Sequence, residues 1–144
     1  MSAARDVAYT VIRAVGEDDA YANLLLPREL ERARLTTADA ALATELTYGT
    51  LRRIGTYDAI IEMAASRSTA EIDAAVLDAL RLGTHQLLAT RVPSHAAVHE
   101  TVDPVGRVAG RRATGFANAV LRRVSERDEE EWLTRIEDAA RSDD

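Results

Sequence analysis

The chain has 144 residues, of which 47% are hydrophobic, 29% are charged and 4% are aromatic. This length suits one domain, and the balance favours a folded chain of packed helices with small and aliphatic side chains rather than a β-sandwich. All 18 basic residues are arginine and no residue is cysteine, which excludes a disulfide framework, a thiol nucleophile, a Schiff-base lysine and a Walker-type phosphate loop.

Apolar residues recur with helical spacing along nearly the whole chain. The pattern predicts helices over residues 2–16, 23–34, 36–53, 57–64, 73–88, 94–105, 116–124 and 128–140. No strand-like alternation of useful length appears. We therefore predict an all-α fold, a bundle of six or seven helices over residues 1–127, followed by an acidic linker or helix over residues 128–144.

Three residues interrupt the helical pattern. Gly49 lowers helix propensity by about 1 kcal/mol relative to alanine, so a close approach of a second helix is expected there. Gly83 is expected to interrupt the fifth helix. Pro104 removes the hydrogen bond to the carbonyl of Glu100 and is expected to kink or end the sixth helix. Residues 104–112 are accordingly expected to form a mobile basic connector.

The charge of the chain is unevenly distributed. Residues 1–124 hold 15 arginines and 15 acidic residues, whereas residues 125–144 hold three arginines and nine acidic residues. The segment 104–124 has five arginines and no acidic residue, a pattern typical of a phosphate-binding patch. The arginines expected to contact RNA phosphates are Arg107, Arg111, Arg112, Arg122 and Arg123, joined by Arg5, Arg52 and Arg53. The alternative is that Arg122 and Arg123 only complement the C-terminus of a helix.

The sequence offers few signs of metal binding or catalysis. His95 and His99 lie four residues apart, so one helix face could present two imidazoles to a metal ion. A catalytic zinc site usually takes three protein ligands, and His85 belongs to a different predicted helix, so no metal site is expected. No spacing singles out a nucleophile with its base, and catalysis by this chain alone is not expected.

The sequence does not have the pattern of a secreted or membrane protein. The N-terminus lacks the basic and apolar run of a signal peptide. No apolar stretch approaches the ~20 residues of a membrane span. A cytoplasmic protein is therefore expected.

Four parts of the sequence, in this order, resemble one family. They are residues 21–27 (YANLLLP), 45–53 (ELTYGTLRR), 80–88 with 92–102 (LRLGTHQLL and VPSHAAVHETV), and 115–123 (GFANAVLRR). The chain resembles the NusB-like RNA-binding fold, in the form found at the N-terminus of the 16S rRNA (cytosine-5-)-methyltransferases of the RsmB/Sun type. The resemblance covers residues 3–124 and implies an all-α fold of two small helical sub-bundles.

The resemblance implies an RNA-binding domain, with 16S rRNA as the expected RNA and the protein's own C-terminal catalytic domain as a partner. In that family the catalytic domain binds S-adenosylmethionine and uses cysteines, so this chain is expected to be a fragment without cofactor or catalytic residues. Arg5 matches the basic N-terminal helix implicated in RNA contact, and Arg122 and Arg123 match a basic ending. Asn118 also matches the family and is expected to bond backbone where helices meet.

Two other functions remain open. The first is a free-standing NusB-type transcription antitermination factor that binds boxA-type RNA together with a ribosomal protein. The second is a protein-interaction module that docks on the catalytic domain, with Trp132 as its buried anchor.

Overall fold

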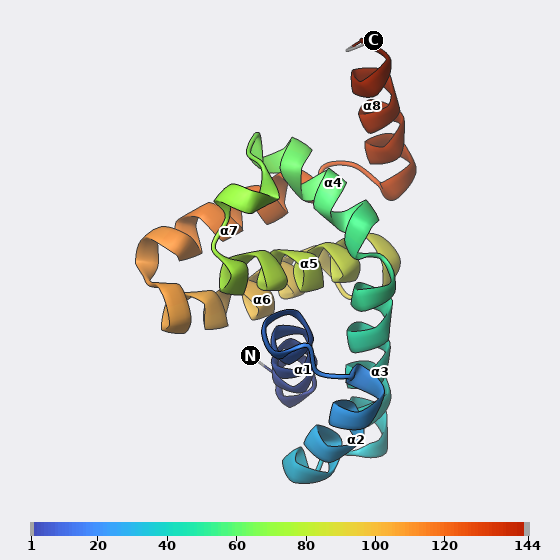
Figure 1. Ribbon diagram of the computed structural model, residues 1–144, viewed down its shortest axis with the longest axis vertical. Helices are drawn as coiled ribbons and strands as arrows, with labels where there is room; N and C mark the ends of the chain where they lie inside the picture. The colour runs from blue at the N-terminus through green and yellow to red at the C-terminus, as the bar shows by residue number, and fades with distance from the viewer. Residues whose placement is uncertain (1, 143–144) are drawn as a thin grey trace.

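The computed structural model describes residues 2–142, and the elements assigned among them are helices (Figure 1). They are α1 (Ala3–Asp18), α2 (Ala22–Ala33), α3 (Thr37–Arg52), α4 (Ile54–Ala65), the short 3-10 helix η1 (Thr69–Glu71), α5 (Ala74–Ala89), α6 (Ser94–Ala109), α7 (Arg111–Val124) and α8 (Glu129–Ser142). The predicted all-α fold is confirmed. Side chains of Ser2, Thr36 and Asp73 accept backbone N–H groups at the starts of α1, α3 and α5, which explains where these helices begin.

The helix count is slightly above the predicted six or seven, because the bundle holds seven α-helices, α1 to α7, and α8 makes eight within residues 2–142. The acidic extension is itself a capped helix, since the Asp128 carboxylate accepts a 2.9 Å hydrogen bond from the backbone amide of Glu131. Trp132 is 3% exposed, and its indole N–H donates to the carbonyl of Val124 at 2.9 Å. These contacts hold the first turn of α8 against the bundle beside α4, and the rest of α8 projects outward (Figure 1).

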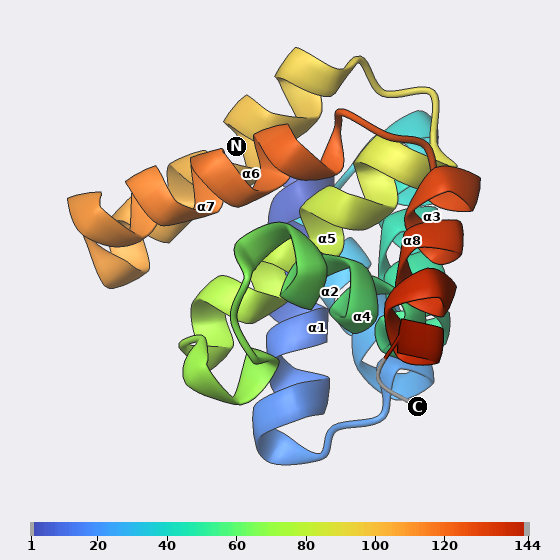
Figure 2. The ribbon, with the colours of Figure 1, turned by 90° about the horizontal axis from the view of Figure 1, so that it is seen from above.

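The helices form two sub-bundles, as the family resemblance implies (Figure 1). Helices α1, α2 and α3 pack around an apolar cluster that includes Val7 and Leu26. Helices α4 to α7 pack around a larger cluster that includes Leu80 and Leu121. α5 belongs to both sub-bundles, because it contacts α1 and α3 as well as α4, α6 and α7. In Figure 2, α6 and α7 lie together at one edge of the molecule, away from α8.

Gly83 does not interrupt α5 and Pro104 does not end α6, so these two expectations are wrong. α5 runs unbroken through Gly83, where a Cβ atom would lie 2.8 Å from Leu121; this glycine serves helix packing instead. α6 continues past Pro104 to Ala109, so the 104–112 segment is helical except at Gly110, which has φ +87°. Pro104 is buried among its neighbours in α6, and this tertiary packing outweighs the one backbone hydrogen bond that proline removes.

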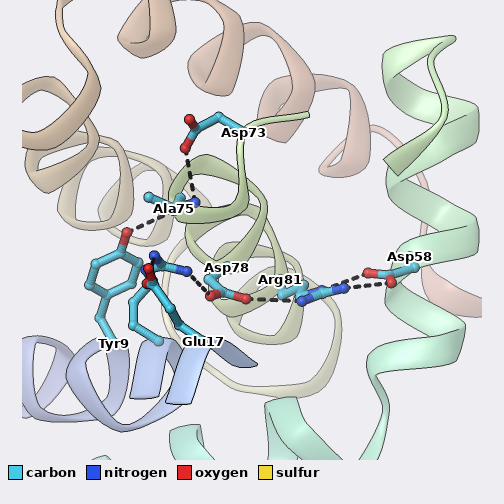
Figure 3. A network of polar contacts seen from close by, with 8 residues as sticks. Tyr9, Glu17, Asp58, Asp73, Ala75, Asp78 and Arg81 are labelled. Atoms are coloured by element: carbon cyan, nitrogen blue, oxygen red, sulfur yellow. Dashed lines mark hydrogen bonds and ion pairs between the residues drawn. The ribbon is translucent and has the colours of Figure 1, made fainter. Parts of the chain in front are cut away.

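Ion pairs join the two sub-bundles at the junction, by which we mean the contact of α5 with α1, α3 and α4. Arg81 in α5 donates two 2.7 Å bonds to the Asp58 carboxylate in α4 and one 2.9 Å bond to Asp78. Asp78 is 3% exposed and also accepts a 2.9 Å bond from Arg13 in α1. Figure 3 shows this row of contacts, with the Tyr9 hydroxyl donating to a carbonyl at the start of α5.

A second polar contact at the junction involves the buried His85 of α5. Its Nδ1 lies 2.7 Å from the Tyr57 hydroxyl, and its Nε2 lies 2.9 Å from a carboxylate oxygen of Glu45. Because a carboxylate only accepts, Nε2 carries the proton and the Tyr57 hydroxyl donates to Nδ1. Burial lowers the pKa of His85 below its ordinary value, against the opposing effect of Glu45. A Cβ atom at Gly49 would lie 2.4 Å from this ring, which confirms the predicted close approach at Gly49.

Candidate nucleic-acid interface

Helices α6 and α7 run antiparallel on either side of Gly110 (Figure 2). Residues of both helices line a groove on the surface, here named the α6–α7 groove. It consists of two hollows of about 300 Å³ each, which share His99 and Asn118. The lining residues are Ser94, His95, Val98, His99, Val102, Asp103, Thr114, Gly115, Asn118, Arg122 and Ser125. The groove thus runs along most of both helices.

Two stripes of side chains border the groove. The α6 stripe is His95, His99, Asp103 and Arg107, and the α7 stripe is Arg111, Gly115, Asn118 and Arg122. Residues at these spacings of three and four share one face of a helix. Arg122 lines one end of the groove, and Arg107 and Arg111 follow on the same stripes past its other end, beside the α6–α7 turn.

The groove arginines are held weakly or not at all by the protein. Arg111 and Arg122 are exposed and have no ion-pair partner among residues 2–142. Arg107 has a side chain that is 64% exposed and lies 4.0 Å from the Asp103 carboxylate. An exposed pair of this kind contributes less than about 1 kcal/mol, so phosphate can replace it at little loss of stability.

The sequence reasoning did not bring His95, His99 and Asn118 into this site. Within the described residues the Asn118 side chain makes no hydrogen bond to the backbone, so the expected structural role is not observed, and Asn118 lines the groove instead. The sequence did contain one signal for these residues: His95 and His99, like Asn118 and Arg122, are four positions apart and so share one face of a helix. It could not show that the two faces meet, because that depends on the geometry of the turn at Gly110.

Arg112 follows Arg111 but faces a different side of α7. Successive residues of a helix are rotated by about 100°, and Arg112 lines a separate cleft together with Phe116 and Arg67. The two neighbouring arginines therefore face different sides of α7, and of the two Arg112 lines a hollow.

Three other arginines that were expected to contact RNA, Arg52, Arg53 and Arg123, make contacts within the protein. Arg53 and Arg123 each contact another helix, whereas Arg52 contacts only its own helix. Arg53 forms an ion pair with Glu129 at the start of α8. Arg123 donates to a carbonyl in the last turn of α4 at 3.0 Å. Arg52 is exposed, and its Nε donates to a carbonyl one turn earlier in α3 at 3.3 Å. None of the three lines the α6–α7 groove.

Arg5 lies inside the protein. It is 9% exposed, and its Nε donates to the Gln86 side chain in α5 at 2.6 Å while a terminal nitrogen donates to Ser2 at 2.9 Å. The Gln86 amide in turn donates to the Thr101 hydroxyl of α6 at 3.0 Å. Because Arg5 connects α1 to α5 in this way, we leave it out of the proposed RNA-contact set.

The three histidines do not converge. His85 is buried at the junction, whereas His95 and His99 are exposed on α6. Across residues 2–142 no three histidine or carboxylate side chains are grouped so that they could hold a metal ion. In the same part of the chain, no helix combines the length and the apolar character needed to cross a membrane.

Relatives of known name are methyltransferases much longer than this chain. A Mycobacterium tuberculosis protein named "Putative methyltransferase" is 49% identical over 140 residues, which cover 97% of this chain and 31% of the relative. The ribosomal RNA small subunit methyltransferase B of Pseudomonas putida is 34% identical over 133 residues, covering 92% of this chain and 30% of the relative. The chain thus spans about a third of the length of these relatives.

Two solved structures share the fold. The solution structure of NusB from Aquifex aeolicus aligns with a TM-score of 0.70 at 26% identity, covering 85% of each chain. A chain from a structure described as a plectonemic RNA supercoil gives a TM-score of 0.80 at 24% identity, over 86% of this chain and 92% of that one. The sequence model of the NusB family matches residues 2–126. The chain therefore belongs to the NusB family.

Proposed function

We propose that the chain is the RNA-binding domain of a 16S rRNA (cytosine-5-)-methyltransferase, and that its α6–α7 groove holds a single strand of the rRNA. Membership of the NusB family and the relatives named ribosomal RNA small subunit methyltransferase B support this function. In the whole protein, a catalytic domain following α8 would receive the target cytosine from the bound strand.

The observation that carries the proposal is the pair of arginines without ion-pair partners in the described chain, Arg111 and Arg122, on one stripe of α7. At 1.5 Å per residue they lie roughly 16 Å apart along the helix. Guanidinium groups bind phosphate through paired hydrogen bonds. His99 and Asn118 line the groove between these two arginines, and their side chains offer hydrogen-bond donors and acceptors. They can bond to the edges of RNA bases, and these edges are fully exposed only in a single strand.

S-adenosylmethionine would supply the methyl group in the catalytic domain. The proposed part of this chain is to bind and orient RNA. An immunoblot of the source cells that shows a polypeptide well above 15.7 kDa would support this division of labour.

The test is a titration of the chain with a fluorescently labelled 16S rRNA stem–loop, followed by anisotropy at several salt concentrations. If Arg107, Arg111 and Arg122 each neutralise one phosphate, log K against log[salt] should have a slope of about −2, at ~0.7 per contact for a single strand. Tight binding with a slope near zero would contradict a phosphate-binding groove.

The same titration separates the alternatives. BoxA-type RNA bound much more tightly than the rRNA stem–loop would support a free-standing antitermination factor. No binding of either RNA at low salt would support a protein-interaction module in which the exposed surface of α8 contacts the catalytic domain; Trp132 is buried against this chain's own bundle.

A further inference from the structure

A cleft of about 410 Å³ lies beside α7, on a different side from the α6–α7 groove. The loop after α4, η1, the start of α5 and the start of α7 form its walls. Its apolar lining consists of Ile72, Val76, Ala109, Ala113 and Phe116, and its charged residues are Arg67, Glu71, Asp73 and Arg112. This volume falls within the range of pockets that bind small molecules, about 300–1,000 Å³.

The cleft combines an aromatic ring with unpaired positive charge. Arg67 and Arg112 are exposed, and neither has an ion-pair partner in the described part of the chain. The guanidinium carbon of Arg67 lies 4.7 Å from the centroid of the Phe116 ring. The Asp73 carboxylate caps α5 through a 3.0 Å bond from a backbone amide, and within residues 2–142 neither Asp73 nor Glu71 forms an ion pair with Arg67 or Arg112.

These features match the chemistry of a nucleotide. Unpaired bases stack on aromatic rings and on guanidinium planes, and stacking on an aromatic side chain is worth about 1–3 kcal/mol per base. The face of Phe116 that now carries a guanidinium can accept a base instead, with Ile72 and Val76 beside it. A phosphate attached to that base can then take the charges of Arg67 and Arg112.

We propose that the cleft binds one unstacked nucleotide of the RNA strand, with its base on Phe116 and its phosphate between Arg67 and Arg112. The proposal rests on the proposed function, because the strand would reach the cleft from the α6–α7 groove. Arg111 lies on the α7 stripe that continues into the groove at Gly115 and Asn118, and the next residue, Arg112, lines the cleft. One strand can therefore pass the start of α7 and contact both.

Fluorine NMR can observe the cleft directly. Phe116 is the only phenylalanine of the chain, so incorporation of 4-fluorophenylalanine places a single fluorine resonance in the cleft. Titration with a purine-rich RNA oligonucleotide should shift this resonance, because a stacked base adds its ring current. The shift should saturate at the same RNA concentration as the anisotropy of the labelled RNA.

Substitution provides a second measurement. Phe116→Leu keeps an apolar side chain at this partly buried position but removes the stacking surface, and should weaken RNA binding about tenfold or more. Phe116→Tyr retains the ring and should bind like the original chain. Tyr21→Leu is the matched control, because Tyr21 is a 73% exposed aromatic residue at the start of α2, outside both hollows.

The outcomes separate this inference from the proposed function. RNA binding with an unmoved fluorine resonance, or equal affinity of Phe116→Leu and the original chain, would overturn the nucleotide site and leave the groove as the binding surface. Loss of all RNA binding by the original chain would overturn both. A saturating shift together with weaker binding by Phe116→Leu, and not by Tyr21→Leu, would establish the cleft as a nucleotide site.

Discussion

The arginines of the junction and those of the α6–α7 groove differ in what surrounds them. At the junction, Arg13 and Arg81 both bond to the buried Asp78, and their side chains are 23% and 18% exposed. On the α7 stripe, Arg122 in the groove and Arg111 beyond its end are exposed and lack ion-pair partners within residues 2–142. An arginine paired to a buried carboxylate holds the fold together, whereas an unpaired one can bind phosphate without breaking a protein contact.

Glycines and histidines show the same difference between the two regions. At the junction, Gly49 lies against the buried ring of His85. Beside the groove, a Cβ atom on Gly115 would meet nothing within 4 Å, and His95 is exposed. Substitutions at the junction should therefore change stability, and substitutions along the groove should change RNA binding.

The largest expected effect is loss of stability in Arg81→Met. The substitution leaves Asp58 without its partner and Asp78 with only Arg13, and removing one member of a buried ion pair typically costs 3–5 kcal/mol. Because the contact is partly exposed, we expect a loss of about 3 kcal/mol in the free energy of unfolding. Urea unfolding followed by circular dichroism measures it.

Arg32→Met is the control for this substitution, since the Arg32 side chain is 81% exposed on α2 and lies 3.8 Å from its partner Glu29. Its free energy of unfolding should change by less than about 0.5 kcal/mol. If Arg81→Met lost less than about 1 kcal/mol, the junction pairs would resemble surface ion pairs and the difference between the two regions would disappear.

The next effect concerns RNA binding rather than stability. Arg111→Ala combined with Arg122→Ala removes two charge-assisted phosphate contacts, each worth at least about 1.5 kcal/mol. Affinity for RNA should fall about 100-fold regardless of sequence, and the salt slope should become shallower by about 1.4. Anisotropy titrations of both RNAs provide the measurement, and the urea midpoint should stay unchanged.

Arg28→Ala combined with Arg32→Ala removes the same charge from the exposed surface of α2. If this control pair weakened RNA binding as much as the groove pair does, net charge rather than the groove would govern the interaction.

Two glycine substitutions compare the packing of the regions. In Gly49→Ala the new methyl group would lie 2.4 Å from the His85 ring, which two hydrogen bonds hold in place. Overpacking of this kind costs about 1–3 kcal/mol, so we expect a loss of about 2 kcal/mol. Gly115→Ala, in open space on α7, should raise stability by up to about 1 kcal/mol. Equal effects of the two substitutions would show that the junction is no more tightly packed than the groove.

The sequence predicts the helices better than the contacts between them. Helical spacing placed the elements, the resemblance implied two sub-bundles, and Gly49 indicated a close approach. Pro104 misled because local propensity does not register the tertiary packing that keeps α6 continuous. Arg5 illustrates the harder problem, since its charge was visible but its hydrogen bond to Gln86, 81 positions later, was not. The groove needed the same long-range information, because its two stripes become one surface only through the turn at Gly110.

The smallest expected effect is a pH dependence of stability that comes from the buried histidine alone. The pKa of His85 is lowered in the folded chain by burial, while an unfolded histidine titrates near 6.5. Below about pH 6.5 the unfolded state binds a proton that the folded state resists, so stability falls as the pH falls. His85 should therefore lower the free energy of unfolding as the pH falls from 7.5 to 5.5, a range in which carboxylates stay largely ionised.

Two substitutions isolate this contribution. His85→Gln keeps a donor and an acceptor for Glu45 and Tyr57 but does not titrate, so its urea midpoint should vary less with pH than that of the original chain. His95→Gln removes an exposed histidine beside the groove and should leave the pH dependence unchanged. If His85→Gln kept the full loss of stability below pH 6.5, the loss would come from a group other than His85. The His85 ring would then take up its own proton as readily in the folded chain as in the unfolded chain. That result requires the Tyr57 hydroxyl to turn away from Nδ1 and the junction to be less rigid than its hydrogen bonds indicate.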